Sequence, residues 1–353
     1  ILAGNINKKG GAFVMDKNDY LEFPKVVKDS VARAGSGKAK NGAYFMQMLD
    51  AVENSAQPLV EALLVYNANP CYSLHTPKAV KAAFSKIPFI VCFTSFMDET
   101  AQEADIVLPV PTFLEKSEDI PTAAGFSKSV VGLSKPIVEP VFDTMHPGDI
   151  LIKLADAIGG TLAENFSWES YEDCLETVTA GIWDSLSDDG FAVISKDAPS
   201  GSARVNVSFL SDSPSTIQAQ GDLPLTLIPI DNMRLISTGV ASSPFAVKTV
   251  SDTVVKGKLS VIEINPKTAK GLGLKDGGHA KLDTPMGSAK VMVTLNEGMM
   301  PGVIGLAEGL GHTFDNEYVA GKGVNINDLI GPVLEQGSGL DAAFGIRASI
   351  SRA

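Results

Sequence analysis

Short apolar runs alternate with amphipathic segments over about the first 150 residues. Runs at residues 59–66, 87–94 and 106–110 are rich in Val, Ile and Leu without polar alternation, which is typical of strands buried in a parallel sheet. A helix is predicted to begin at Thr76-Pro77, because a hydroxyl cap followed by proline is a common helix start. A second, short helix is predicted over residues 99–104. The pattern indicates an α/β domain whose sheet is covered on both faces.

The middle of the chain is predicted to be helical and to end in a polar connector. Residues 149–158 have the apolar spacing of an amphipathic helix, which should end at Gly159-Gly160. Another helix is predicted over residues 168–186, with Ser167 as its cap. Residues 187–221 are rich in Ser, Asp, Pro and Gly and predict an irregular connector with one strand at 205–209.

Closely spaced short strands are predicted from about residue 222 onward. Turns rich in Gly, Pro and Asp separate them, and residues 283–287 predict a hairpin loop. This spacing favours a small β-barrel over a parallel sheet. We therefore expect three parts: an α/β domain over 1–147, a helical segment and linker over 148–221, and a barrel domain over 222–353. The predicted barrel strands are 223–230, 259–264, 279–283, 289–295, 302–306 and 344–350.

Composition and charge exclude several classes of protein. The 353 residues are 44% hydrophobic, enough for a sizeable core, and 29 basic against 41 acidic residues give a net charge of −12. This balance argues against nucleic acid and anionic lipid as main partners. No apolar run approaches the roughly 20 residues that span a bilayer, so we expect no direct membrane span. Three cysteines are too few for a disulfide framework or for the four thiolates of an iron–sulfur cluster.

No self-contained catalytic apparatus can be read from the sequence. His75, His146, His279 and His312 are scattered without metal-ligand spacing, and hydrogen-bonded or surface histidines are the simpler interpretation. His312 is the histidine that could contact a ligand, because the neighbouring glycines would let a ligand approach the backbone. Motifs of the GxSxG, HExxH and P-loop types are absent. The cysteines at 71 and 92 are expected to be small buried apolar residues.

Polar loops follow the first two predicted strands. Residues 67–70 (Asn-Ala-Asn-Pro) follow the first, and Thr94-Ser95 follow the second. The carboxyl ends of parallel strands lie at one edge of a sheet, where open α/β sheets bind nucleotide-like ligands. Two interpretations stay open at this point: a ligand-binding edge, or two turns closed by their own hydroxyl and amide groups.

Several segments in succession resemble the molybdopterin oxidoreductase family, which includes dimethyl sulfoxide, polysulfide and nitrate reductases and formate dehydrogenases. The similar segments in the first half are GNINKKGG at 4–11, Asn69-Pro70, and ETAQEADIVLPVPTFLEK at 99–116. In the barrel, the segments at 265–277 and GVNINDL at 323–329 are similar to the family's dinucleotide-binding domain. Within the family, the segments at 139–149, 244–249, 309–312 and 338–343 most resemble the menaquinone reductase branch.

The resemblance implies that the chain is the carboxyl-terminal half of a larger subunit. It implies a partial Rossmann-like parallel α/β domain followed by a double-psi β-barrel. The cofactor would be molybdopterin guanine dinucleotide with molybdenum or tungsten. The iron–sulfur cluster and the metal ligand of the family would belong to the missing N-terminal half, so no catalytic or metal-ligating residue is assigned to this chain.

Cofactor-binding residues are carried over from the family by position. Those of the α/β part would contact the nucleotide, ribose and phosphates. Those of the barrel would face the pterin, with the loop at 232–238 opposite the cofactor. The residues so implied are Asn69, Pro70, Thr94, Ser95, Lys116, Arg234, His312, Asn325 and Asn327.

The resemblance further implies an oxidoreductase subunit in a quinone-linked complex of anaerobic respiration. The complex would be periplasmic and membrane-associated through an iron–sulfur electron-transfer subunit and a membrane quinone-binding subunit. The loop at 232–238 lacks the Thr-Gly and His/Trp-rich pattern of metal-loaded reductases, and Phe344 stands where Lys or Gln is common. An alternative therefore stays open, in which the chain is a metal-free scaffold that keeps the fold but not the cofactor. An unrelated α/β-plus-barrel binding protein is a third possibility.

Overall fold

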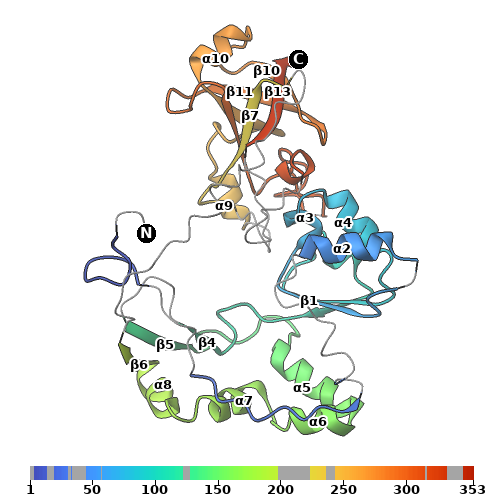
Figure 1. The fold of residues 1–353 in the computed structure, drawn as a ribbon, viewed down its shortest axis with the longest axis vertical. Helices are drawn as coiled ribbons and strands as arrows, with labels where there is room; N and C mark the ends of the chain where they lie inside the picture. Colours follow the sequence, from blue (N-terminus) through green and yellow to red (C-terminus); the bar gives the residue numbers. More distant parts are fainter. Residues whose placement is uncertain are drawn as a thin grey trace. The chain divides into compact units, whose positions relative to one another are not determined.

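The chain folds into two compact units, each built from two separate stretches of sequence (Figure 1). One unit takes residues 1–40 and 109–212, and the other takes 41–108 and 213–353. The predicted domain boundaries after residues 147 and 221 stay predictions. The computed structural model describes residues 4–13, 20–30, 33, 45–56, 58–121, 128–197, 223–235, 243–314, 316–331 and 345–353.

A three-stranded sheet forms the α/β part of the second unit. Its strands are β1 (Leu63–Tyr66), β2 (Ile90–Thr94) and β3 (Ile106–Pro109), in that order. β1 and β2 run parallel, which confirms the parallel pairing expected from the apolar runs. β2 begins at residue 90 instead of 87, because Pro88 has no N–H to donate to the ladder.

Three helices pack beside this sheet: α2 (Phe45–Asn54), α3 (Pro70–Ser73) and α4 (Pro77–Phe84). Leu49, Val80 and Ile90 belong to the apolar cluster that joins α2 and α4 to β2. Leu64 and Tyr66 of β1 stay exposed at 47% and 45%. The expectation of cover on both faces is therefore wrong for β1 among the described residues.

The segment around η1 and the start of α4 differ in detail from the prediction. The helix expected over 99–104 is a single 3₁₀ turn, η1 (Ala101–Glu103). α4 begins at Pro77 as predicted, but the Thr76 hydroxyl does not cap it. Thr76 has a left-handed backbone, with φ 55° and ψ 60°, and its hydroxyl donates instead to the carbonyl of His75 at 2.6 Å.

The second part of this unit is a closed β-barrel (Figure 1). All six predicted barrel strands are present, in the order β11-β10-β13-β7-β12-β9, and pairing of β11 with β9 closes the ring. β7 with β12 and β9 with β11 are parallel pairs. The strands are β7 (Leu225–Ile230), β9 (Leu259–Ile264), β10 (His279–Asp283), β11 (Ser288–Leu295), β12 (Val303–Ala307) and β13 (Ile346–Arg352).

Alternating burial along the barrel strands explains why they could be predicted. In β11 every second side chain from Ala289 to Val293 is buried, and Ile262, Ile304 and Leu282 are fully buried inside the barrel. The hairpin loop between β10 and β11 is confirmed, closed by a hydrogen bond from the Thr284 N–H to the Gly287 carbonyl at 2.8 Å. Accessory elements are β8 (Val255–Lys256), α9 (Pro244–Lys248), α10 (Pro266–Gly271) and η3 (Ile326–Asp328).

The other compact unit contains an antiparallel sheet and, among its described residues, helices α5 to α8 (Figure 1). The sheet order is β4-β5-β6. The elements are β4 (Glu118–Ile120), β5 (Lys128–Ser134), α5 (Pro147–Ile158), α6 (Gly160–Asn165), α7 (Tyr171–Val178), α8 (Trp183–Asp189) and β6 (Phe191–Asp197).

Two predictions for this unit are wrong and one is confirmed. α5 ends at Gly159 as predicted. The single helix expected over 168–186 is two helices, α7 and α8, separated by a turn that contains Gly181, and the cap of α7 is Ser170 rather than Ser167. The connector expected from residue 187 instead contains the end of α8 and β6. The strand predicted at 205–209 lies outside the described residues.

The strained backbone of Thr76 generates a stability prediction. A β-branched residue rarely tolerates the left-handed region, which costs about 1–2 kcal/mol, whereas glycine adopts it freely. Thr76→Gly is expected to unfold in urea with a free energy equal to or above that of the wild type. Thr76→Val keeps the strain and loses the hydroxyl bond, so it should be less stable by about 1 kcal/mol. If the glycine variant were less stable than the valine variant, the left-handed backbone at residue 76 would not be a source of strain.

Candidate functional site

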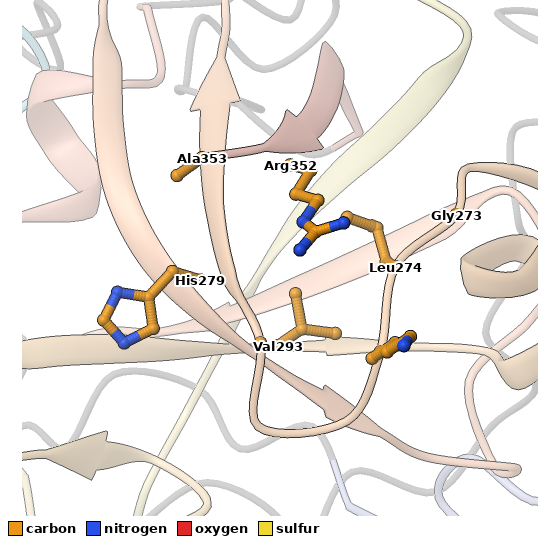
Figure 2. A pocket seen from close by; sticks show the side chains of 8 residues that line it. Gly273, Leu274, His279, Val293, Arg352 and Ala353 are labelled. Atoms are coloured by element: carbon orange, nitrogen blue, oxygen red, sulfur yellow. The ribbon is translucent and has the colours of Figure 1, made fainter.

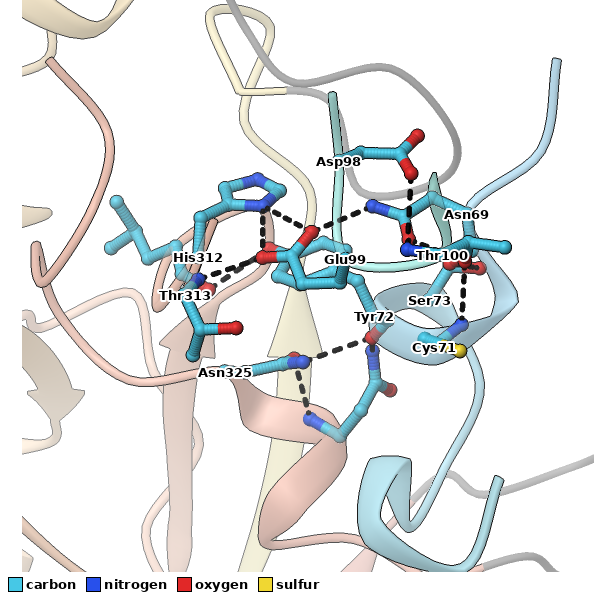
Figure 3. A network of polar contacts seen from close by, with 12 residues as sticks. Asn69, Cys71, Tyr72, Ser73, Asp98, Glu99, Thr100, His312, Thr313 and Asn325 are labelled. Carbon is cyan, nitrogen blue, oxygen red and sulfur yellow. Dashed lines mark hydrogen bonds and ion pairs between the residues drawn. The ribbon is translucent and has the colours of Figure 1, made fainter. Parts of the chain in front are cut away.

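A buried polar network joins the α/β part to the barrel within the second compact unit (Figure 3). Its α/β side comprises Asn69, at the start of α3, and Glu99 and Thr100, before η1. Its barrel side comprises His312, Thr313, Asn325 and Asn327. Apart from Thr313, each of these residues is at most 9% exposed. Polar groups buried this deeply require partners, and most of theirs lie within the network.

The Glu99 carboxylate is at the centre of the network. It accepts the Thr313 N–H at 2.7 Å and an Asn69 amide N–H at 2.8 Å, and it lies 3.1 Å from His312 Nδ1. Burial would raise the pKa of Glu99, but the hydrogen bonds from His312 and Asn69 outweigh it and lower the pKa to about 2. Glu99 is therefore ionised at neutral pH.

Asn69 connects the loop after β1 to the start of η1. Its side-chain oxygen accepts the Thr100 N–H at 3.1 Å and the Thr100 hydroxyl at 2.8 Å. The same hydroxyl oxygen accepts the Cys71 N–H at 3.1 Å. Asn67 lies in the same loop with a left-handed backbone, φ 45°, and its N–H bonds to the Phe93 carbonyl at 3.0 Å. The two polar loops predicted from the sequence therefore do lie at one edge of the sheet.

The His312 imidazole is held between aromatic rings. Tyr72 stacks on it with centroids 3.8 Å apart, and Phe314 meets it edge-on at 5.3 Å. The Tyr72 hydroxyl donates to the Leu310 carbonyl at 2.9 Å. Because the Glu99 carboxylate can only accept, His312 Nδ1 carries a proton. His312 Nε2 is buried and has no hydrogen-bond partner among the described residues.

Two asparagines fasten η3 to the α3–α4 segment. The side-chain amides of Asn325 and Asn327 both donate to the Tyr72 carbonyl, at 2.9 and 3.1 Å. Asn327 Oδ1 lies 2.9 Å from His75 Nδ1, and its backbone carbonyl accepts the Thr76 N–H at 2.9 Å. The main polar groups of Asn327 are thus engaged by the protein itself.

Two glycines near His312 leave room for neighbouring atoms of the protein itself. A Cβ at Gly311 would lie 2.0 Å from the Asn325 nitrogen, and its φ is +78°. A Cβ at Gly323 would lie 2.5 Å from the Ser260 hydroxyl oxygen. At Gly311 the close approach inferred from the sequence is made by the chain's own atoms.

The structure brings together five of the nine predicted site residues: Asn69, Pro70, His312, Asn325 and Asn327. Thr94 is buried and exchanges hydrogen bonds with the Phe96 backbone, and Ser95 is half-buried beside it. Exposed Arg234 donates to the Thr249 carbonyl at 2.6 Å. Lys116 belongs to the other compact unit and pairs with Glu118. The contacts of all nine with a cofactor stay predictions.

The sequence pattern does not identify three residues of the site: Glu99, Tyr72 and Thr100. Glu99 lies in the segment that carries the family resemblance, but its sequence pattern predicts only the beginning of a short helix. A carboxylate shortly after a predicted buried strand is a usable signal, since such a group requires compensation when buried. The partner that compensates it, His312, is 213 residues away and gives no local signal.

The other titratable side chains of this unit are weaker candidates for a functional site. Cys71 and Cys92 are buried as expected, and burial raises the pKa of each thiol to about 12. No cluster of three or more His, Cys, Asp or Glu side chains in the described stretches is arranged to hold a metal ion. A surface hollow of about 250 Å³ on the barrel is lined in part by Lys275, His279 and Arg352 (Figure 2), but all three are exposed.

Replacing Glu99 should test its place at the centre of the network. Glu99→Gln removes one of the two acceptor oxygens and leaves Asn69 or Thr313 without a partner, so the free energy of unfolding should fall by about 2 kcal/mol. Glu103→Gln is the matched control, because Glu103 makes a partly exposed ion pair with Lys81 at 3.0 Å and should cost less than about 1 kcal/mol. Equal losses measured by urea denaturation would contradict a special role for Glu99.

The depressed pKa of Glu99 also predicts a pH dependence. Its pKa is about 2 when folded against 4.5 for the ordinary group, so the unfolded state binds more protons between these values. The stabilisation by Glu99, about 3 kcal/mol at most, is present above pH 4.5 and is lost as the pH falls toward 2. The stability difference between wild type and Glu99→Gln should therefore shrink over this interval. A difference that stays constant would show that the carboxylate is not ionised.

Comparisons with known proteins agree on one family. The model of the molybdopterin oxidoreductase family matches residues 2–157, and that of the molydopterin dinucleotide binding domain matches residues 243–343. The chain is 33% identical to the menaquinone reductase, molybdopterin-binding-like subunit of Nitratidesulfovibrio vulgaris, over all of this chain and 49% of the relative. It is 24% identical to the assimilatory nitrate reductase catalytic subunit of Bacillus subtilis, over 95% of this chain and 49% of that one.

A solved structure supports the same grouping at the level of the fold. Acetylene hydratase from Pelobacter acetylenicus aligns with a TM-score of 0.67 at 17% identity, over 87% of this chain and 46% of that chain. The chain spans about half the length of the curated relatives named above. The two family models cover both the α/β part and the barrel. The chain belongs to the molybdopterin oxidoreductase family.

Proposed function

We propose that this chain is the part of an oxidoreductase subunit that binds a pterin guanine dinucleotide cofactor. The observation that carries the proposal is the junction in the second compact unit, where the carboxyl ends of β1 and β2 and the barrel loops contribute to one polar network. Dinucleotides bind at this edge in open α/β sheets. The family model of the dinucleotide-binding domain matches residues 243–343 and supports the proposal that the barrel contributes to cofactor binding.

The residues present fit such a group. The buried and unpartnered His312 Nε2 is a polar atom for which the described chain supplies no partner, and buried atoms of this kind usually meet a ligand or water. Asn69 uses one amide hydrogen on Glu99 and has a second to donate. When bound, the pterin and its molybdenum or tungsten would supply the redox chemistry. The chain's own residues would bind and orient the cofactor.

We extend the proposal to the finer topology and the setting. The two parallel strand pairs in an otherwise antiparallel barrel support a double-psi topology. The similarity to a menaquinone reductase subunit supports a quinone-linked complex. We further propose that this complex serves anaerobic respiration in the periplasm. Partners would be the N-terminal half of the same subunit, an iron–sulfur subunit and a quinone-binding membrane subunit. None of the helices in the described part of the chain has the length and apolar character needed to cross a bilayer.

A metal-free scaffold is the second candidate, and one observation favours it. The side chains of Asn325 and Asn327 and His312 Nδ1 are already engaged within the protein. The relative from Nitratidesulfovibrio vulgaris is itself described as molybdopterin-binding-like. A scaffold would keep these contacts, and with them the junction, without holding a cofactor.

Elemental analysis of the native full-length protein distinguishes the two candidates. The proposed function predicts molybdenum or tungsten at about one atom per chain, together with the fluorescence of oxidised pterin in a denatured extract. The matched control is the same protein after denaturation, gel filtration and refolding, which should contain neither. Absence of metal and pterin from the native protein would overturn cofactor binding and leave the scaffold.

A further inference from the structure

His312 is the network residue whose hydrogen-bonding capacity is left half used. It is 2% exposed, Nδ1 faces Glu99, and Nε2 has no partner in the described part of the chain. Leaving a buried polar atom unpaired is costly, because its hydration is lost without replacement. The neighbouring asparagines, by contrast, use both ends of their side-chain amides within the protein. The unpaired nitrogen therefore distinguishes His312 from its neighbours.

The surroundings of His312 fix its ring in one orientation. Tyr72 and Phe314 hold its plane, and Glu99 holds Nδ1. Glu99 is held in turn by Asn69 and by the Thr313 N–H. A carboxylate that accepts from one imidazole nitrogen fixes the tautomer and so decides what the other nitrogen can do. With Nδ1 held by Glu99, Nε2 is the ring atom left to meet a partner.

We propose that His312 Nε2 is the ligand-facing atom of the network and makes a hydrogen bond to a polar atom of the bound heterocycle. Glu99 is a positioning residue for His312, and Asn69 is a positioning residue for Glu99. This inference rests on the proposed function and names the atom that meets the cofactor. The chain Asn69–Glu99–His312 then links the loop after β1 to the cofactor through the barrel.

Two substitutions separate the nitrogens of His312. The amide of asparagine occupies the place of Nδ1, and the longer glutamine reaches the place of Nε2. His312→Asn should therefore keep a partner for Glu99 and lose the ligand contact. His312→Gln should leave Glu99 without that partner while placing an amide where the ligand contact is made. Phe84→Leu is the control for packing, since Phe84 is buried in the apolar cluster of α2, α4 and β2 and is not part of the polar network.

Pterin and metal per folded full-length molecule are then measured after extensive dialysis. We expect the His312→Asn protein to retain the cofactor about tenfold less well than wild type, as for loss of one buried hydrogen bond. His312→Gln should retain more cofactor than His312→Asn but be less stable in urea. Phe84→Leu should retain it as the wild type does. Wild-type retention in His312→Asn, or an equal loss in Phe84→Leu, would overturn the proposal.

Nitrogen NMR of histidine-labelled protein tests the positioning role separately. In the wild type, His312 should show a protonated Nδ1 that is hydrogen-bonded to Glu99, and Glu99→Gln should change the chemical shift of that nitrogen. An Nδ1 without a proton in the wild type would refute the positioning role of Glu99. A wild-type protein without any pterin or metal refutes the proposed function and this inference together. A loaded wild type with an unaffected His312→Asn refutes the inference alone.

Discussion

The ionised carboxylate of Glu99, buried between the α/β part and the barrel, is the interaction on which this junction depends. A buried charge is costly unless it is fully hydrogen-bonded. Its donors come from the loop after β1, through Asn69, and from the barrel loop, through His312 and Thr313. Separating the two parts would leave the Glu99 carboxylate without most of its hydrogen-bond donors. The carboxylate therefore strongly favours their association.

The remaining contacts of the junction follow from this constraint. The Tyr72 carbonyl receives two asparagine amides from η3, and Thr76 keeps a strained backbone while its N–H bonds to the Asn327 carbonyl. Strain of this kind persists where surrounding contacts determine the conformation. Most of the polar side chains at the proposed site therefore build the junction, and one imidazole nitrogen, His312 Nε2, has no partner among the described residues. This arrangement suits a region that holds and orients a cofactor more than one that performs acid–base chemistry.

Apolar surface elsewhere on the chain fits the proposal that it is one part of a larger subunit. Leu64 and Tyr66 of β1 are about half exposed, and Ile137, Val141 and Phe142 in the other unit are exposed by 75% or more. Apolar side chains exposed to this extent are typical of surfaces that pack against another chain or domain. The relatives, about twice as long as this chain, contain further polypeptide that could cover such surfaces.

The barrel was the part of the fold that local sequence determined best. Alternating burial in β10 and β11 corresponds to a period of two in the sequence. The turn at 283–287 marks where β10 ends and β11 begins. The helical region was harder, because the break between α7 and α8 depends on a turn around Gly181 that the helical periodicity does not reveal. The late start of β2, by contrast, could have been inferred from Pro88.

The sequence by itself determined the barrel strands, the parallel and barrel classes, the family and several of the candidate residues, because periodicity, turn chemistry and motif succession are local properties. Tertiary structure alone decided that β11 pairs with β9 to close the barrel, and that Asn325 and Asn327 bind the Tyr72 carbonyl. It also decided that Glu99 meets His312, 213 residues away. A carboxylate is compensated by whichever donors the fold brings near it, and that proximity is not encoded in the residues beside it.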